Sequence, residues 1–219
     1  MSNGAGVLYQ LSDEARRRVL TAASRRRFAR GEVIFHEGDP GEAVHVVAKG
    51  HVAIRVTTRL GDVATLRVLG VGEIFGEQAL IAPDAHRAAT ARAIDAVETH
   101  LIVREHFDEL RRTHPEIDRY LVEVLVFQVR RLSRHLQEAL FVTSDKRVLR
   151  RLVDLCDFFG AADGTAVIPM TQTDIASMAG ASRSTANRVF KAAEEAGLLA
   201  LRRGSVQVLD QEALASEAR

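Results

Sequence analysis

The sequence has 219 residues, of which 47% are hydrophobic and 27% are charged, a balance typical of a globular chain that can bury a core. The formal net charge is +1, so overall charge neither indicates nor excludes a nucleic-acid partner. Cys156 is the only cysteine, which excludes an internal disulfide and a four-thiolate iron–sulfur site and suits a reducing cytoplasm.

The first 30 residues read as a helical segment without the basic region and apolar core of a secretion signal. Ser12 is a suitable N-cap, and Asp13 and Glu14 follow in the first turn, where carboxylates are favoured. The basic run at 25–27 then indicates a solvated face. Because no apolar run reaches the roughly 18 residues of a membrane helix, we expect a cytoplasmic protein that does not span a membrane.

Short β-branched runs alternate with glycines from residue 31 to residue 103. Strands at such close spacing, with glycine at the turns, are typical of a small antiparallel barrel or sandwich. We therefore expect a β domain in this region. The predicted strands are 33–35, 45–47, 52–56, 64–69 and 96–103.

A stretch before the last of these strands contains a candidate ligand site. Arg87 follows Glu77 by ten residues and precedes Ala88 and Ala89, whose small side chains leave the backbone N–H groups accessible. A short helix beginning near Gly76 would direct free N–H groups at an anion, Arg87 would bind the same anion, and Glu77 would accept a hydroxyl. A cyclic nucleotide offers one phosphate and one ribose hydroxyl. The alternative is a surface ion pair between Glu77 and Arg87 without a ligand.

No glycine or proline interrupts the chain from Pro115 to about Ala139, which predicts one long helix. Its apolar residues recur at alternating spacings of three and four, as in a coiled coil, and a second apolar set lies off this seam, where it could pack on the barrel. We expect a dimerising helix over 116–140, with a buried helix of a monomer as the alternative. The seam is Val122, Leu125, Val129, Leu132, Leu136 and Ala139, and the second set is Leu121, Val124, Val126 and Phe127.

A third region follows the long helix. Residues 145–159 have the pattern of an amphipathic helix that Gly160 ends, and Cys156 lies on its apolar face as a structural thiol. Further on, Thr171 and Asp174 fit a capping box at the start of a helix over 172–179.

Gly180 then provides a turn, Ser182 a new N-cap, and residues 183–196 a second helix that ends at Gly197. Two helices joined by a tight glycine turn are the layout of a helix-turn-helix motif. Residues 198–209 read as two short strands around a turn at 203–204, which would form a wing.

Charge placement in this region favours a DNA partner. No acidic residue occurs from Ile175 to Ala193, and Arg183 lies in the first turn of the second helix, where an arginine can bind guanine in a bidentate contact. The alternative is a structural helical hairpin with a solvated face. The candidate DNA contacts are Thr171, Ser182, Arg183, Ser184, Thr185, Asn187, Arg188, Lys191, Arg202 and Arg203.

Two motifs carry a family resemblance. The run Phe75-Gly-Glu-Gln-Ala-Leu-Ile, with Arg87-Ala-Ala-Thr after it, resembles the phosphate-binding cassette of cyclic-nucleotide-binding domains. Residues 181–191 resemble a recognition helix, and together the motifs place residues 8–210 close to the CRP/FNR family of bacterial transcription regulators.

The resemblance implies an α+β protein: an N-terminal antiparallel β-barrel or jelly-roll cyclic-nucleotide-binding domain at 1–115, a dimerisation helix and hinge at 116–143, and a winged helix-turn-helix domain at 144–219. Gly76 and Glu77 would hold the ribose, Arg87 and the Ala88 backbone the cyclic phosphate, and the long helix would cover the base. The implied ligand-binding residues are Phe75, Gly76, Glu77, Gln78, Arg87, Ala88, Ala89, Leu132 and Ser133.

Three residues depart from the family pattern. Leu132 stands where cAMP-binding members have a threonine, so it cannot bond the adenine amino group, although Ser133 fits. Ala88 replaces the usual bacterial Ser or Thr, but Arg-Ala-Ala-Thr is what regulatory subunits of cAMP-dependent kinase carry, which favours cAMP over cGMP. Ser184 replaces the usual Glu of the DNA helix, so the common family half-site is not assumed.

The sequence thus predicts a homodimeric transcription regulator with cAMP as its allosteric ligand, a palindromic double-stranded DNA operator, and RNA polymerase as a further candidate partner. One alternative is a regulator of the same family whose sensor binds another small ligand or none. Another is a haem gas sensor, although the eight histidines show no distinctive spacing. We find no nucleophile–base pair or metal cluster and therefore do not expect an enzyme.

Overall fold

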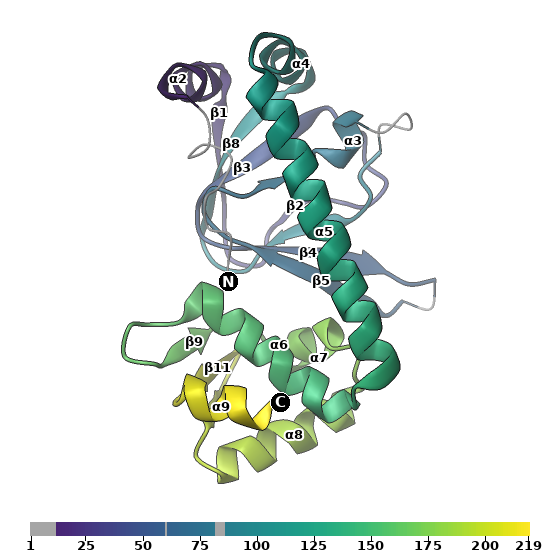
Figure 1. Ribbon diagram of the computed structural model, residues 1–219, viewed down its shortest axis with the longest axis vertical. Coiled ribbons are helices and arrows are strands. Elements are labelled where there is room, and N and C mark those ends of the chain that lie inside the picture. Colours follow the sequence, from purple (N-terminus) through teal and green to yellow (C-terminus); the bar gives the residue numbers. More distant parts are fainter. Residues whose placement is uncertain (1–11, 60, 82–85) are drawn as a thin grey trace. The chain divides into compact units, whose positions relative to one another are not determined.

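The computed structural model describes residues 12–59, 61–81 and 86–219 (Figure 1). The described chain divides into two compact units. Of the described residues, the N-terminal unit comprises those of 12–56 and 67–130, and the C-terminal unit comprises those of 57–66 and 131–219. The domain limits 1–115, 116–143 and 144–219 stay a proposal, and residues 1–11 lie outside the described part.

Two antiparallel four-stranded sheets form the β domain, as predicted. Their strand orders are β1-β8-β3-β6 and β2-β7-β4-β5. The strands are β1 (Ser24–Phe28), β2 (Val33–Phe35), β3 (Ala43–Lys49), β4 (Val52–Thr57), β5 (Val63–Leu69), β6 (Ile74–Phe75), β7 (Thr90–Ala93) and β8 (Val97–Val103).

Strand β1 corrects the expectation that the first 30 residues are helical. The described helix is α2 (Asp13–Ala22), and residues 24–28 instead pair antiparallel with β8, from Ser24 opposite Leu101 to Phe28 opposite Val97. Arg25 and Arg27 reach Glu98 at 3.8 and 3.1 Å. A run of arginines lacks the apolar–polar alternation of a strand, so the pairing depends on a partner strand 69 to 77 residues away in the chain. The short strands β6 and β7 were also not predicted.

Alternate residues of β3 face two different cores. Val44 and Val46 pack in a cluster with residues of α2, α4 (Arg104–Thr113) and α5 (Pro115–Phe141), whereas Val47 belongs to a cluster with residues of β4, β5, β7 and β8. Helices α2 and α4 lie beside each other in Figure 1. The two-residue period of a strand thus gives β3 one side toward the helices and one toward the barrel interior.

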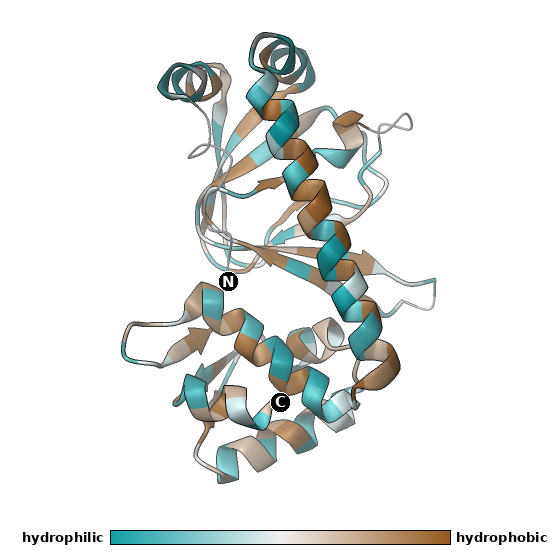
Figure 2. Cartoon of the chain, in the orientation of Figure 1, coloured by the Kyte–Doolittle hydropathy of each residue, from teal (hydrophilic) through white to brown (hydrophobic). Residues whose placement is uncertain are grey.

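Helix α5 is continuous over the predicted span, and brown apolar segments recur along it (Figure 2). Most of its apolar seam is exposed. Leu121 is buried and Val124 packs against the same cluster, as expected. Val126 and Phe127 are 45% and 47% exposed, so the prediction that they pack on the barrel is wrong. A helix presents one stripe to its neighbour, and Leu121 and Val124 already occupy that stripe.

The C-terminal unit contains the predicted winged helix-turn-helix. Helix α6 packs against α7, α8 and α9, and the wing strands belong to a three-stranded sheet of order β10-β11-β9, whose third strand the sequence did not reveal. Cys156 is buried on α6, and burial raises the pKa of its thiol to about 11. The thiol is therefore protonated at neutral pH and unreactive, as expected of a structural cysteine. The elements are α6 (Ser144–Phe159), β9 (Ala166–Ile168), α7 (Gln172–Met178), α8 (Arg183–Glu195), β10 (Leu199–Arg202), β11 (Ser205–Val208) and α9 (Gln211–Glu217).

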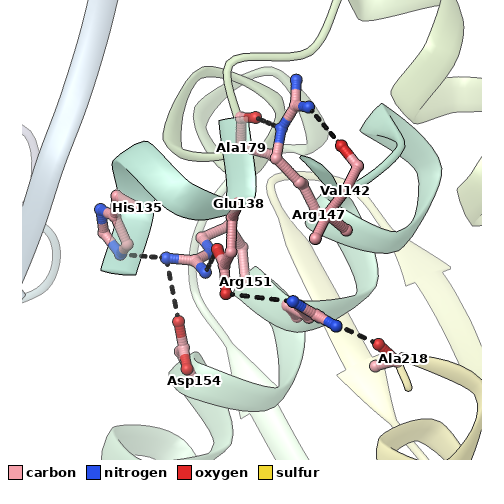
Figure 3. Close-up of polar contacts among 9 residues, drawn as sticks. His135, Glu138, Val142, Arg147, Arg151, Asp154, Ala179 and Ala218 are labelled. Carbon is pink, nitrogen blue, oxygen red and sulfur yellow. Dashed lines mark hydrogen bonds and ion pairs between the residues drawn. The ribbon is translucent and has the colours of Figure 1, made fainter. Parts of the chain in front are cut away.

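A buried ionic cluster joins the end of α5 to α6 (Figure 3). Arg151 donates to Glu138 and to His135, and it forms an ion pair with Asp154 at 3.1 Å. Burial, and then the charge of Arg151, lowers the pKa of His135 to about 4, so its ring is neutral and can accept from the guanidinium. The last turns of α5 are therefore fixed to α6 by bonds that are largely shielded from water.

Candidate ligand site and nucleic-acid interface

Arg87 is held in the N-terminal unit with its guanidinium already in place. It is only 6% exposed, donates from Nη1 to the Gly76 carbonyl at 2.9 Å and from Nη2 to the Ala43 carbonyl at 2.7 Å, and lies 4.2 Å over the Phe35 ring. Its Nε–H is buried and has no hydrogen-bond partner among the described residues. A buried, unpartnered donor on a fixed cation is suited to an anionic acceptor.

Gly76 makes this arrangement sterically feasible. Its φ is +81°, a conformation that residues with a side chain rarely adopt. A Cβ atom at this position would lie 2.4 Å from Nη1 of Arg87. The glycine is therefore required both by the backbone turn after β6 and by the guanidinium beside it.

Glu77 is buried beside the same cation, with 3% exposure. Its Oε1 accepts from Nε2 of Gln128 on α5 at 3.2 Å, and Oε1 of Gln128 accepts from Nε2 of Gln78 at 3.1 Å. The alternative of a surface ion pair is wrong, because both Glu77 and Arg87 are buried and Arg87 donates to carbonyls. Gln128 was not predicted, and a glutamine on a helix surface gives no sequence signal for such a bond.

A second arginine shapes the electrostatics of the site. Arg104 donates to the carbonyls of Gly41, Ala79 and Leu80 at 2.8, 3.0 and 3.2 Å, and so fixes the short helix α3 (Gln78–Ile81). Burial is the main cause that lowers the pKa of Arg87; Asp39 and Glu77 oppose this shift and Arg104 adds to it. A bound anion would compensate the two neighbouring cations.

Not all predicted ligand residues come together in one unit. The N-terminal unit contains Phe75, Gly76, Glu77, Gln78 and Arg87. Ala88 and Ala89 follow Arg87 in the chain; Ala88 is exposed and Ala89 is half-buried. Leu132 and Ser133 are exposed on the part of α5 that belongs to the C-terminal unit.

The helix-turn-helix forms with the predicted caps. Thr171 accepts from the Asp174 backbone N–H at 3.1 Å while the Asp174 carboxylate accepts from the Thr171 backbone N–H, also at 3.1 Å, which completes the capping box. Gly180 has φ +56°, and Ser182 accepts from the Thr185 backbone N–H at 3.1 Å. The Thr171 cap fixes the start of α7, and the Ser182 cap fixes the start of α8.

The remaining DNA candidates line the exposed side of α8 and the wing. The opposite side of α8 is buried through Ala186, Val189, Phe190 and Ala193. A shallow hollow is lined by Ser184, Asn187, Arg188, Lys191, Ala192 and Glu195. The exposed candidates are Thr171, Ser182, Arg183, Ser184, Asn187, Arg188, Lys191, Arg202 and Arg203, and Thr185 is half-buried.

Asp145 contributes a carboxylate to this basic surface. The sequence analysis did not predict an acid at this position of the fold. Its carboxylate accepts from both terminal amino groups of Arg188, each at 2.7 Å. The hydrogen bond from Arg188 is the main cause that lowers the pKa of Asp145, and the same bond raises the pKa of Arg188. Both groups therefore stay charged at neutral pH.

A buried arginine beside a buried acid in a β domain, followed by a winged helix-turn-helix, defines a ligand-sensing, DNA-binding regulator. Comparison with known proteins agrees with this class. Residues 25–114 match the model of the cyclic nucleotide-binding domain, and residues 146–217 match that of the Crp-like helix-turn-helix domain.

Full-length relatives give the family. The chain is 31% identical over 195 residues to the CRP-like cAMP-activated global transcriptional regulator of Mycobacterium tuberculosis, covering 88% of this chain and 87% of the relative. It is 31% identical over 206 residues to the cyclic AMP receptor protein of Thermus thermophilus, covering 94% and 93%.

Among solved structures, the c-di-GMP-responsive global regulator CLP of Xanthomonas campestris matches with a TM-score of 0.75 and 26% identity, over 90% of this chain and 99% of that one. The chain belongs to the CRP/FNR family, and it is a DNA-binding transcription regulator with a cyclic-nucleotide-binding domain, not an enzyme. In the described parts of the chain, no helix has the length and apolar character to cross a membrane.

Proposed function

We propose that this protein is a homodimeric transcription regulator that binds DNA in the cytoplasm under allosteric control by cAMP. The observation that carries the proposal is the buried guanidinium of Arg87, whose Nε–H has no hydrogen-bond partner among the described residues, and whose charge is felt by the buried carboxylate of Glu77. A cation that can bind an anion and a carboxylate that can accept a hydroxyl are the two groups that the phosphate and the ribose hydroxyl of one cyclic nucleotide would need. The relatives of Mycobacterium tuberculosis and Thermus thermophilus are both named for cAMP, which supports this ligand.

The residues divide between the two ends of the ligand. Arg87 and the backbone N–H groups of Ala88 and Ala89 would bind the cyclic phosphate, with Nε–H as the added donor. Gly76 and Glu77 would bind the ribose.

Gln128 now donates to Glu77, so its amide must either share that carboxylate with the ribose hydroxyl or release it. Phe75 and Gln78 flank this pair, and Leu132 and Ser133 would lie over the base.

The C-terminal unit would read DNA through α8. Arg183 in its first turn is exposed and would bind a guanine edge, and Arg202 and Arg203 of the wing would bind the phosphate backbone. Two copies of the chain would present two recognition helices to half-sites of a palindrome about 34 Å apart. The short polar groups of Thr171, Ser182, Ser184, Thr185 and Asn187, together with Arg188 and Lys191, complete the surface. RNA polymerase is a further proposed partner.

Replacement of the arginine tests the ligand. We expect Arg87→Ala to weaken cAMP binding, measured by isothermal titration calorimetry, by at least about tenfold, because it removes charge-assisted bonds to the phosphate. Since Arg87 also bonds to two carbonyls, a thermal melt must show that the variant is folded. Glu77→Gln is the second variant: it keeps an acceptor for Gln128 but loses the charge. Unchanged affinity in both folded variants would contradict the proposal.

A different ligand is the second candidate. Leu132 cannot bond an adenine amino group, and the Xanthomonas campestris structure belongs to a regulator described as responsive to c-di-GMP. Parallel titrations with cAMP, cGMP and c-di-GMP discriminate these ligands, and an absorption spectrum tests the haem alternative. Tighter binding of c-di-GMP than of cAMP would establish the second candidate.

A further inference from the structure

One arginine of the recognition helix is held by an acid from another helix. Arg188 lies in the middle of α8, and Asp145 is the second residue of α6, 43 positions earlier in the chain. Nη1 donates to one carboxylate oxygen and Nη2 to the other, both at 2.7 Å. Such a matched pair fixes the plane of the guanidinium as well as its position.

The pair lies at the surface and not in the core. The side chains of Arg188 and Asp145 are 66% and 38% exposed, and Arg188 lines the hollow on the exposed side of α8. Exposed ion pairs contribute little to folding stability, so the fold does not require this one. Its position on the surface proposed to face DNA indicates a role in recognition.

Three donors of Arg188 remain after the pair has formed. A guanidinium has five N–H groups, and the carboxylate takes one from each terminal nitrogen. The Nε–H and one N–H of each terminal nitrogen are left, which suffices for a bidentate contact to guanine O6 and N7. The pair therefore does not prevent Arg188 from binding a base.

The pair does change what Arg188 offers to the DNA backbone. A free, exposed arginine can bind a phosphate on any sequence, and such contacts supply non-specific affinity. The carboxylate of Asp145 neutralises the guanidinium and repels phosphate. A base edge presents neutral acceptors, so its contact with Arg188 is much less affected.

We propose that Asp145 is a positioning residue that determines DNA specificity: it orients Arg188 toward one base of each half-site and withholds it from phosphates. This inference rests on the proposed role of α8 as the recognition helix. Asp145→Asn should release the arginine, so that non-specific binding becomes stronger while discrimination at one base pair becomes weaker.

The test begins with selection of binding sites from a randomised duplex pool by the full-length protein, with cAMP present and, separately, absent. Fluorescence anisotropy then gives the affinity for the selected duplex and for a scrambled duplex across a range of salt concentrations. We expect Asp145→Asn to lower the ratio of the two affinities by about tenfold, the scale of one bidentate base contact. It should also steepen the salt dependence on scrambled DNA by about one phosphate contact.

Matched variants separate this role from a change in charge. Asp145→Glu should restore part of the discrimination, and Asp145→Asn should have no effect on base preference in an Arg188→Ala background. Glu212→Gln, exposed on α9 and outside the hollow, makes the same charge change as a control.

An unchanged or increased affinity ratio for Asp145→Asn would overturn the inference, since it would mean that Asp145 merely competes with DNA for Arg188. If the wild-type protein selects no sequence under either condition, the proposed role of α8 fails and the inference with it. If the wild type selects a sequence that Asp145→Asn selects equally well, only the inference fails.

Discussion

Two basic side chains are buried in the β domain, one of them charged and the other neutral. Burial lowers the pKa of both Arg87 and His45. The ordinary pKa of an arginine is so high that Arg87 stays charged, whereas the pKa of His45 falls to about 3 and its ring is neutral. The His45 ring stacks on Phe75 with centroids 5.0 Å apart, and its Nδ1 lies 3.1 Å from the Thr99 hydroxyl oxygen. The neutral ring thus packs in the barrel interior without adding a second charge near Arg87.

This shift predicts a pH dependence of stability. In the unfolded chain His45 binds a proton near pH 6.5, whereas the folded chain does so only near pH 3. The unfolded state therefore takes up more protons between these values, and the free energy of unfolding falls as the pH is lowered, by up to about 1.4 kcal/mol per pH unit.

Urea denaturation from pH 7 to pH 4 measures this slope. His45→Gln should reduce the slope of the free energy of unfolding against pH. Part of the slope will remain, because the pKa of His135 is also lowered. His106→Gln, at an exposed position of α4, is the control and should leave the slope unchanged. Equal slopes in the wild type and in His45→Gln would show that His45 is not buried as a neutral ring.

At the scale of elements, α5 has one apolar stripe more than a single chain can bury. Leu121 packs in the N-terminal core, whereas Val122, Val129, Leu132 and Leu136 are between 56% and 61% exposed. These four follow the spacing of a coiled-coil seam. Large apolar side chains in such a row are typical of an interface, so we propose the same stripe of a second copy as the partner.

Charge on this stripe should separate the dimer. We expect Leu136→Glu to weaken self-association by about 100-fold or more, since it removes a leucine that the proposed dimer would bury in both copies and places two like charges together. Sedimentation velocity measures the change, and Gln137→Glu, the next residue and off the seam, is the control. A dimer of unchanged strength in Leu136→Glu would show that α5 does not form the interface.

For the whole molecule, the proposed control by a ligand requires that a signal pass from the ligand site to α8. Helix α5 begins with Pro115 in the N-terminal unit, contributes Gln128 to the ligand site, and ends at Phe141 in the C-terminal unit. There the buried pair of Glu138 and Arg151 fixes it to α6 (Figure 3). A change in α5 on ligand binding would thus be transmitted to the DNA-binding unit, and the hinge at 143–144 would be ordered with it.

Linkage makes this coupling measurable from either end. If cAMP raises the affinity for the operator, the operator must raise the affinity for cAMP by the same factor, typically about 5- to 150-fold. Calorimetric titration of cAMP with and without the selected duplex tests this, with the scrambled duplex as control. Identical cAMP affinities in all three would mean that the two sites are not coupled.

Elements that depend on local information could be predicted from the amino-acid sequence. The long helix follows from an uninterrupted apolar repeat, and the two helices after Thr171 follow from their caps and glycines, because neighbours in the chain decide such features. The cassette around Glu77 and Arg87 was identified in the same way. The family assignment then rested on the order of these motifs.

Contacts between residues far apart in the chain became visible only in the folded molecule. The arginine run of β1 became a strand because β8 supplied its hydrogen bonds. Gln128 reached Glu77, and Asp145 reached Arg188, because packing brought their elements together. Local composition carries no record of such partners: a glutamine or an aspartate on a helix looks solvated until the fold places an acceptor or a cation beside it.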